Sequence, residues 1–337
     1  MEQTCLKILN SLRYPNGLFA ASAKDVNTGY NLCWIRDNIY STLGFEAVHN
    51  FKEAVRTYHA LLDILLKHEY KIDWAIREKP KHKHQYIHAR YNPATMEEIW
   101  DDWGNKQNDA IGALLFKIGE LEEKGVRVIR DENDSRIVQK LVLYLNSIEF
   151  WQDADNGMWE NEEEIHASSV GACVAGLKKI RKVIDIDQKL IDDMMNKGML
   201  TLRMLLPRES RSKHTDLALL SLIYPYNIVE ESVAQRILEN VEASLVKEKG
   251  VVRYAGDWYY ANEEKKEAQW CMGFPWLAII YKLRGRKDKY AEYMRKASVI
   301  MTPEGALPEL YYANSTKYNE NSPLGWAQAL YLMGLKT

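Results

Sequence analysis

The chain has 337 residues, 46% of them apolar, so it is long enough to bury one large core or two ordinary ones. Its formal net charge of −2 gives no basic footprint for nucleic acid, and no lysine-rich amphipathic run marks a membrane surface. No window approaches 18 uninterrupted apolar residues, and the first residues, MEQTCLKILNSLRY, lack the pattern of a secretory signal. We therefore expect neither nucleic-acid binding nor membrane insertion.

The cysteines and the aromatic residues narrow the class of protein further. Cys5, Cys33, Cys173 and Cys271 are widely spaced and form no C-x-x-C pair, which predicts reduced, packed thiols in a cytoplasmic protein. The 10 Trp and 20 Tyr against 6 Phe favour rings that carry a polar group. Such rings suit a cleft for a sugar, but they also fill large helical cores, and composition alone leaves both interpretations open.

Apolar periodicity predicts helices along the whole chain and almost no strands. The expected helices span residues 2–13, 36–49, 51–70, 107–123, 134–152, 167–183, 187–206, 215–223, 230–247, 269–284, 287–301 and 323–335. Short connections join several neighbours, as antiparallel helix pairs require, and no Gly/Ser-rich or Pro-rich linker divides the chain. We predict an all-α fold, a single (α/α)6 barrel of six helical hairpins that occupies residues 1–337.

Clusters of Trp, Arg, Asp and Glu precede or begin every second predicted helix. They lie at residues 30–37, 100–109, 159–160, 214–216, 253–276 and 308–326. In a closed ring of hairpins, the loops before alternate helices converge on one end of the barrel, so these side chains are expected to form a pocket there.

The stretch 155–166, DNGMWENEEEIH, contains a candidate catalytic residue, Glu160. Glu160 follows Trp159, and a carboxyl group packed against an indole has its charged form disfavoured, which raises its pKa. Such a group can stay protonated near neutral pH and donate a proton to a leaving oxygen. A surface loop whose carboxylate faces a helix N-terminus is the alternative for these two residues.

Five motifs in order resemble those of the glucoamylase family, glycoside hydrolase family 15. They are Y-x-x-x-W-x-R-D from Tyr30, W-G-x-x-Q-x-D from Trp103, D-N-G-x-W-E from Asp155, R-Y-x-x-D-x-Y-Y from Arg253, and P-E-x-Y with P-L-x-W from Pro308. The segments HARYNPATMEEIWDDWGNKQNDAIGALL and TDLALLSLIYPYNIV are also similar to the helical region of phosphorylase kinase α and β regulatory subunits.

The glucoamylase resemblance implies that Glu160 is a general acid and Glu309 a general base, which would activate a water and invert the anomeric configuration. It implies that Arg36 and Asp37 grip the terminal glucose, that Arg253 is a further donor, and that Trp103 and Tyr30 lie beside the reacting sugar. Trp159, Asp109 and Tyr311 complete the expected substrate-binding set, although Asp109 also fits a helix cap, as Asp216 does. Trp34 and Trp326 are expected to pack rather than touch substrate.

The resemblance therefore predicts an inverting, exo-acting α-glucoside hydrolase that takes a small oligosaccharide and needs no cofactor and no metal. Asn161 stands where several secreted glucoamylases carry a second Glu, so the linkage and chain-length preference stay open. Two alternatives remain: a non-catalytic carbohydrate-sensing module like the kinase subunits, and another α/α-barrel enzyme that uses His166 or His214. The His-containing run at 81–84 with His88 lacks a complete metal-ligand set, and the sequence does not indicate an oligomeric state.

Overall fold

The computed structural model describes residues 1–101 and 103–337, and this part of the chain is predominantly helical. The elements in order are α1 (Glu2–Leu12), β1 (Cys33–Trp34), α2 (Ile35–Ala47), α3 (Phe51–Lys67), α4 (Glu69–Arg77), η1 (Lys83–Gln85), β2 (Arg90–Tyr91), α5 (Asn108–Glu123), α6 (Glu132–Ile148), α7 (Ala167–Ile180), α8 (Gln188–Leu205), η2 (Leu217–Leu222), α9 (Glu231–Ser244), β3 (Gln269–Trp270), α10 (Gly273–Leu283), α11 (Lys287–Val299), β4 (Leu310–Tyr311) and α12 (Gly325–Lys336).

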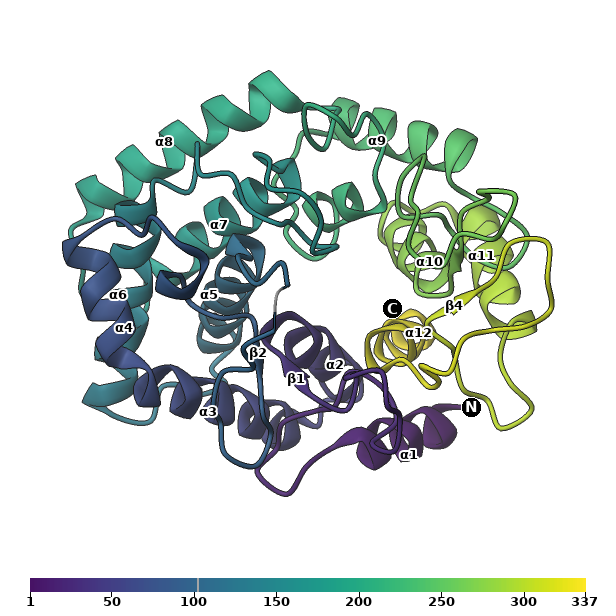
Figure 1. The fold of residues 1–337 in the computed structure, drawn as a ribbon, viewed down its shortest axis with the longest axis horizontal. Helices are drawn as coiled ribbons and strands as arrows, with labels where there is room; N and C mark the ends of the chain where they lie inside the picture. The colour runs from purple at the N-terminus through teal and green to yellow at the C-terminus, as the bar shows by residue number, and fades with distance from the viewer. Residues whose placement is uncertain (102) are drawn as a thin grey trace.

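Six inner segments form a closed ring. In order around the barrel, α2, α5, α7, η2, α10 and α12 each pack on the next, and α12 packs back on α2 (Figure 1). The helices α1, α3 with α4, α6, α8, α9 and α11 lie around this ring (Figure 1). The two ends of the chain meet, because Lys336 forms an ion pair with Glu2. The predicted (α/α)6 barrel is confirmed.

The sequence separates inner from outer helices through their apolar patterns. In α7, ASSVGACVAGLKKI, 12 of the 14 residues are buried, as an apolar helix with neighbours on all sides requires. In α8 the buried residues are Ile191, Met194, Gly198 and Leu202, a single stripe at helical spacing. Amphipathic helices can cover the ring with one face and leave the other in water.

Small residues bring two inner helices into close approach. A Cβ added to Gly112 of α5 would lie 2.4 Å from backbone atoms of Ala172 and Cys173 in α7, which is too short for any side chain. Gly176 of α7 faces the carbonyl of Gly112 in the same way. Glycine is therefore required where these helices cross, and the tight crossing fixes the spacing of the loops that enter α5 and α7.

Several predicted boundaries differ from the structure by a few residues, such as the end of the helix expected over 134–152 at Ile148, and three differences have a clear physical reason. The helix expected over 51–70 ends at Lys67, and a separate helix, α4, follows it. The segment expected as a helix at 215–223 is the 3-10 helix η2, which stops shortly before Pro225, a residue that has no N–H for a further turn. Residues 269–270, expected in a helix, form β3 instead, and α10 begins at Gly273 with Pro275 in its first turn, where a missing N–H costs little.

Two short antiparallel ladders tie together loops that precede inner helices. β1 pairs with β2 through Cys33 with Tyr91 and Trp34 with Arg90. β3 pairs with β4 through Gln269 with Tyr311 and Trp270 with Leu310. These ladders hold the loops at one end of the barrel. Among the described helices, none is long and apolar enough to cross a lipid bilayer.

Candidate active site

A pocket with about 440 Å3 of empty space, part of it open to solvent, lies where the loops before the inner helices converge. Four of these loops, with the first turns of α2 and α12, supply its walls. The lining residues are Ala21, Tyr30, Trp34, Arg36, Asp37, Met158, Trp159, Glu160, Arg253, Trp270, Met272, Glu309, Leu324 and Trp326.

The loop that carries Glu160 is held in an unusual backbone conformation. An isolated bridge between Asp155 and Glu164 closes the loop at its base. Gly157 has a φ of 63°, and its Cα lies against the buried ring of His166, where a Cβ would be 2.6 Å from the ring. Glu160 itself has a φ of 62°, a left-handed conformation that non-glycine residues adopt at a cost. The surrounding contacts must therefore impose this orientation on Glu160.

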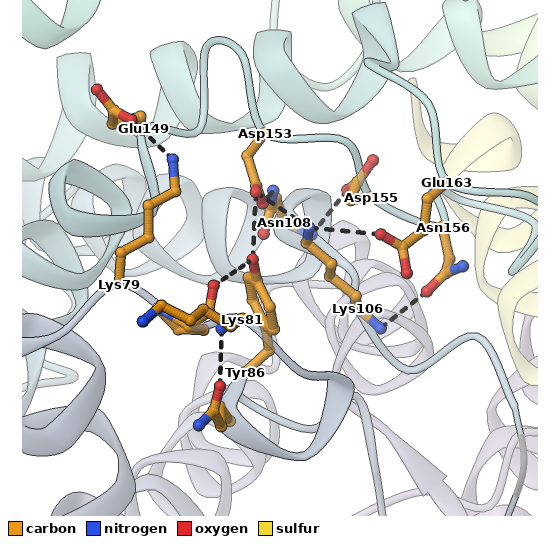
Figure 2. A network of polar contacts seen from close by, with 12 residues as sticks. Lys79, Lys81, Tyr86, Lys106, Asn108, Glu149, Asp153, Asp155, Asn156 and Glu163 are labelled. Atoms are coloured by element: carbon orange, nitrogen blue, oxygen red, sulfur yellow. Dashed lines mark hydrogen bonds and ion pairs between the residues drawn. The ribbon is translucent and has the colours of Figure 1, made fainter.

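Buried polar contacts anchor this loop to the start of α5 (Figure 2). Lys106 Nζ lies 3.0 Å from Asp153 Oδ1 and 3.6 Å from Glu163 Oε2. Asn108 donates its side-chain amide to Asp153 Oδ2 at 2.9 Å and its backbone N–H to Asp155 Oδ2 at 2.9 Å. Because Lys106, Asn108, Asp153 and Asp155 are buried and paired, the loop has little freedom to shift the end that carries Glu160.

Among the described residues, Glu160 accepts a hydrogen bond from one side chain. Trp103 donates its indole N–H to Glu160 Oε2 at 2.9 Å, and Arg36 Nη1 lies 4.0 Å from Oε1. Burial raises the pKa of Glu160, while Arg36 and then Trp103 oppose the rise. The balance leaves a pKa above the usual range, which suits a group that must carry a proton.

Glu309 is buried and accepts three hydrogen bonds. Tyr30 donates its hydroxyl to Oε1 at 2.6 Å, and the side-chain amides of Asn319 and Asn321 donate to Oε2 at 2.5 Å and 2.8 Å. Burial raises the pKa of Glu309, and these three donors, together with Arg253, lower it. Compared with Glu160, this carboxyl group accepts more hydrogen bonds from described side chains, whereas the rise in the pKa of Glu160 is opposed mainly by guanidinium groups.

Arg36 and Asp37 begin α2 and have different partners. Arg36 Nε donates to Asp109 Oδ2 at 2.8 Å, and its other nitrogens donate to Gln107 Oε1 and to the backbone oxygen of Met158. Arg36 therefore ties α2 to α5 and to the acid-bearing loop, and it also lines the pocket. Asp37 lines the pocket with no ion pair to a described residue, and burial raises its pKa to about 7.

Aromatic rings build the opposite wall around Arg253. Its guanidinium is paired in bidentate fashion with Asp257, at 2.6 Å and 2.8 Å, and lies 4.4 Å from the ring centroid of Trp270. Trp159 donates its indole N–H to Asp216 Oδ1 at 2.7 Å and stacks near Trp326 with 6.1 Å between centroids. The hydrogen bond to Asp216 fixes the Trp159 ring, whereas the indole N–H groups of Trp270 and Trp326 are buried without a hydrogen-bond partner among the described residues. These rings offer flat apolar faces to the C–H face of a sugar.

The structure brings together most of the residues predicted from the motifs. Seven of them line the pocket: Tyr30, Arg36, Asp37, Trp159, Glu160, Arg253 and Glu309. Trp103 lines a second, outer hollow that shares Glu160 with the pocket. Asp109 lies behind the pocket as the partner of Arg36, and the Tyr311 hydroxyl donates to the carbonyl of Ile300 instead of facing the pocket. The predicted cap is present, because Asp216 accepts the N–H of Ala218 at the start of η2.

Sequence reasoning missed several pocket residues. Trp34 and Trp326, expected to pack, line the pocket. Trp270 and Met272 were hidden because their segment was read as the start of a helix. The spacing of Asn319 and Asn321 could have indicated that both face the same way, because side chains two residues apart in an extended segment lie on one side. Two asparagines after a Pro-Glu motif do not by themselves indicate a chemical role.

The described residues contain no group of three or more His, Cys, Asp or Glu side chains placed to hold a metal ion. His166 is buried and His214 is exposed, and neither lines the pocket. The reactive side chains that line the pocket include three carboxyl groups, those of Asp37, Glu160 and Glu309, together with the Tyr30 hydroxyl and two guanidinium groups.

Comparison with known proteins identifies the family. The model of Glycosyl hydrolases family 15 matches residues 6–333, and the chain belongs to this family. A structure titled "Glycosidase Wild Type" superposes with a TM-score of 0.83 at 18% identity, over 99% of this chain and 94% of that one. A bacterial glucoamylase complexed with acarbose gives a TM-score of 0.75 at 15% identity, over 98% of this chain and 54% of that one.

Curated relatives are of a different kind. The regulatory subunit alpha of phosphorylase b kinase from rabbit skeletal muscle is 25% identical over 89% of this chain, and the mouse liver isoform is 26% identical over 99% of it. The chain spans about 30% of the length of these relatives.

Proposed function

We propose that the protein is an inverting, exo-acting α-glucoside hydrolase that releases β-glucose from the non-reducing ends of short α-glucans. The observation that carries this proposal is the pair Glu160, partly buried, and Glu309, fully buried, two carboxyl groups that line one pocket in different hydrogen-bond environments. Two carboxyl groups in unlike environments are the requirement for glycoside hydrolysis by an acid and a base.

Glu160 is the proton donor in this mechanism. Burial favours its protonated form. Trp103 donates to Oε2, and no neutral donor among the described residues hydrogen-bonds to Oε1, so Oε1 can carry the proton. As the glycosidic bond breaks, the leaving oxygen takes this proton and Glu160 becomes ionised. Arg36, 4.0 Å away, then stabilises the charge that appears on the carboxylate.

Glu309 is the base. Asn319 and Asn321 occupy Oε2, so Oε1, which accepts from Tyr30, is the oxygen that remains to take a proton from the attacking water. Water attacks the face of the sugar opposite the departing group, so the configuration inverts and β-glucose forms. Tyr30 lies beside this oxygen and fixes its direction.

The shape of the pocket supports the release of single terminal units. Trp159, Trp270 and Trp326 line it with flat faces, and Arg253 and Asp37 supply charged groups for sugar hydroxyls. One of the similar solved structures is titled as a glycosidase variant in complex with glucose, which supports the binding of a glucose unit in this fold.

A cytoplasmic location stays a prediction from the cysteines, all four of which are buried and free.

The proposal is tested by incubating the purified protein with maltose, isomaltose and maltotriose and measuring glucose release. We expect release from at least one of them, and loss of that activity in Glu160→Gln and Glu309→Gln, each checked for a native circular dichroism spectrum. A folded wild-type protein that releases no glucose from any α-glucoside would contradict the proposal.

A non-catalytic carbohydrate-binding module is the second candidate, because the curated relatives are named regulatory subunits. It predicts that glucose or maltose binds in a titration calorimeter while no bond is cleaved. The retention of both carboxyl groups in one pocket favours the enzyme, since binding alone has no use for an acid opposite a base.

A further inference from the structure

A second hollow opens beside the pocket and shares Glu160 with it. Among the residues that line this outer hollow are Trp103, Glu160, Asn161, Lys213, Tyr254 and Trp258. Its empty space is about 930 Å3, roughly twice that of the inner pocket. Because the acid must reach the bond that joins two sugar units, the space on its far side is where the departing part of a substrate has to lie.

Trp258 is the unusual residue of this hollow. Its side chain is 74% exposed, whereas the other tryptophans of the hollow and the pocket are packed or hydrogen-bonded. It lies in the same short segment as Arg253 and Asp257, which are locked together by their ion pair. A large apolar ring that is left in water on a segment fixed by a buried pair offers a face to a ligand.

Polar groups beside Trp258 complete the hollow. Lys213 Nζ donates to Asn161 Oδ1 at 2.8 Å and lies 4.2 Å from the ring centroid of Tyr254. Lys213 forms no ion pair with a described carboxylate, because the nearby Glu164 is occupied by Ser210 and Ser212. An ammonium group with further N–H donors next to an aromatic face matches the hydroxyl rim and the C–H face of a sugar.

We propose that the outer hollow binds the leaving sugar of the substrate, with Trp258 as its stacking surface and Lys213 as its hydroxyl donor. This inference rests on the proposed function and deepens it. It names the preferred substrates as α-glucosides whose leaving group is itself a neutral sugar, and it makes Trp258 a specificity-determining residue.

The test compares two substrates that fill the inner pocket alike. α-Glucosyl fluoride carries no leaving sugar, whereas maltose and isomaltose do. In Trp258→Ala, we expect kcat/KM on the responding disaccharide to fall by about tenfold more than kcat/KM on the fluoride, equivalent to about 1.4 kcal/mol. Trp258→Phe, which keeps an aromatic face, is expected to restore most of the loss. Tyr70→Ala removes an equally exposed ring, 71% exposed and outside both cavities, and serves as the matched control.

The outcomes separate the inference from the function it rests on. If the wild-type protein cleaves both substrates and Trp258→Ala loses the same factor on each, or nothing on either, the assignment of the outer hollow is wrong and the proposed function stands. If the folded wild-type protein cleaves neither the fluoride nor any disaccharide, both are overturned. A loss confined to the disaccharide, absent in Tyr70→Ala, supports the inference.

Discussion

Removing the Asn321 side-chain amide, which donates to Glu309, should shift the acidic limb of the pH profile of catalysis to higher pH. Asn321 donates to Glu309 Oε2 at 2.8 Å, and its own side-chain oxygen is held by Thr28 at 2.6 Å, so the amide is pre-oriented. A hydrogen bond to a charged group contributes about 1.5–3 kcal/mol, and one pKa unit corresponds to about 1.4 kcal/mol. Asn321→Ala is therefore expected to raise the pKa of Glu309 by about 1–2 units.

The sign of the kinetic effect follows from the role of the base. Glu309 must be ionised to take a proton, so a higher pKa shifts the acidic limb of the kcat/KM profile to higher pH by the same amount. The assay is the rate of glucose release measured from pH 3.5 to 8.5 for the wild type, Asn321→Ala and Asn133→Ala, a control on the outer helix α6. An acidic limb that stays in place, or moves to lower pH, in folded Asn321→Ala would refute the assignment of Glu309 as the base.

Three further predictions follow from other contacts. Trp103→Phe removes the indole N–H that stabilises ionised Glu160, so the pKa of the acid and the basic limb of the kcat/KM profile should both move up, by about half to one unit; an unchanged basic limb would count against Glu160 as the acid. Asp37 has a pKa of about 7 in the folded protein against an ordinary value of 3.8, so the folded protein binds this proton more tightly than the unfolded chain does. The resulting contribution to the free energy of unfolding is fully present below about pH 4 and is lost as pH rises through 7. Asn does not titrate, so the Tm of Asp37→Asn minus that of the wild type should increase from pH 4 to pH 8 in a thermal melt, and a flat difference would disprove the burial of this charge. Gly112→Ala places a Cβ 2.4 Å from the α7 backbone and should lower the unfolding free energy by about 1–3 kcal/mol, seen as a fall in Tm of several degrees; an unchanged Tm would contradict the close crossing of α5 and α7.

The helical architecture was readable because burial imposes a period of 3.6 on each helix. The outer helix α8 has its stripe of Ile191, Met194 and Leu202, and the inner helix α7 is apolar on all sides. The periodicity did not distinguish η2 from an α-helix, because a six-residue segment contains at most two turns of either kind. It also missed β3, whose two residues are held by pairing with a partner about 40 residues away in the sequence.

The candidate site was readable where a motif places its residues in loops that must converge. Glu160, Glu309 and Arg253 are of this kind. Asp109 and Tyr311 belong to the same motifs, yet they contact Arg36 and Ile300. A motif indicates which residues lie near the site, but tertiary contacts decide whether each side chain faces the pocket or packs behind it. The amides of Asn319 and Asn321 on Glu309 depend on such contacts entirely.

The central claim is that Glu309 activates a water on the face opposite the leaving sugar. Proton NMR of the first minutes of hydrolysis, recorded before the anomers of glucose equilibrate, tests it most directly. We expect the β-anomer of glucose to appear first from whichever α-glucoside the protein cleaves. If α-glucose appears first, the configuration is retained, and the water-mediated mechanism assigned to Glu160 and Glu309 is wrong.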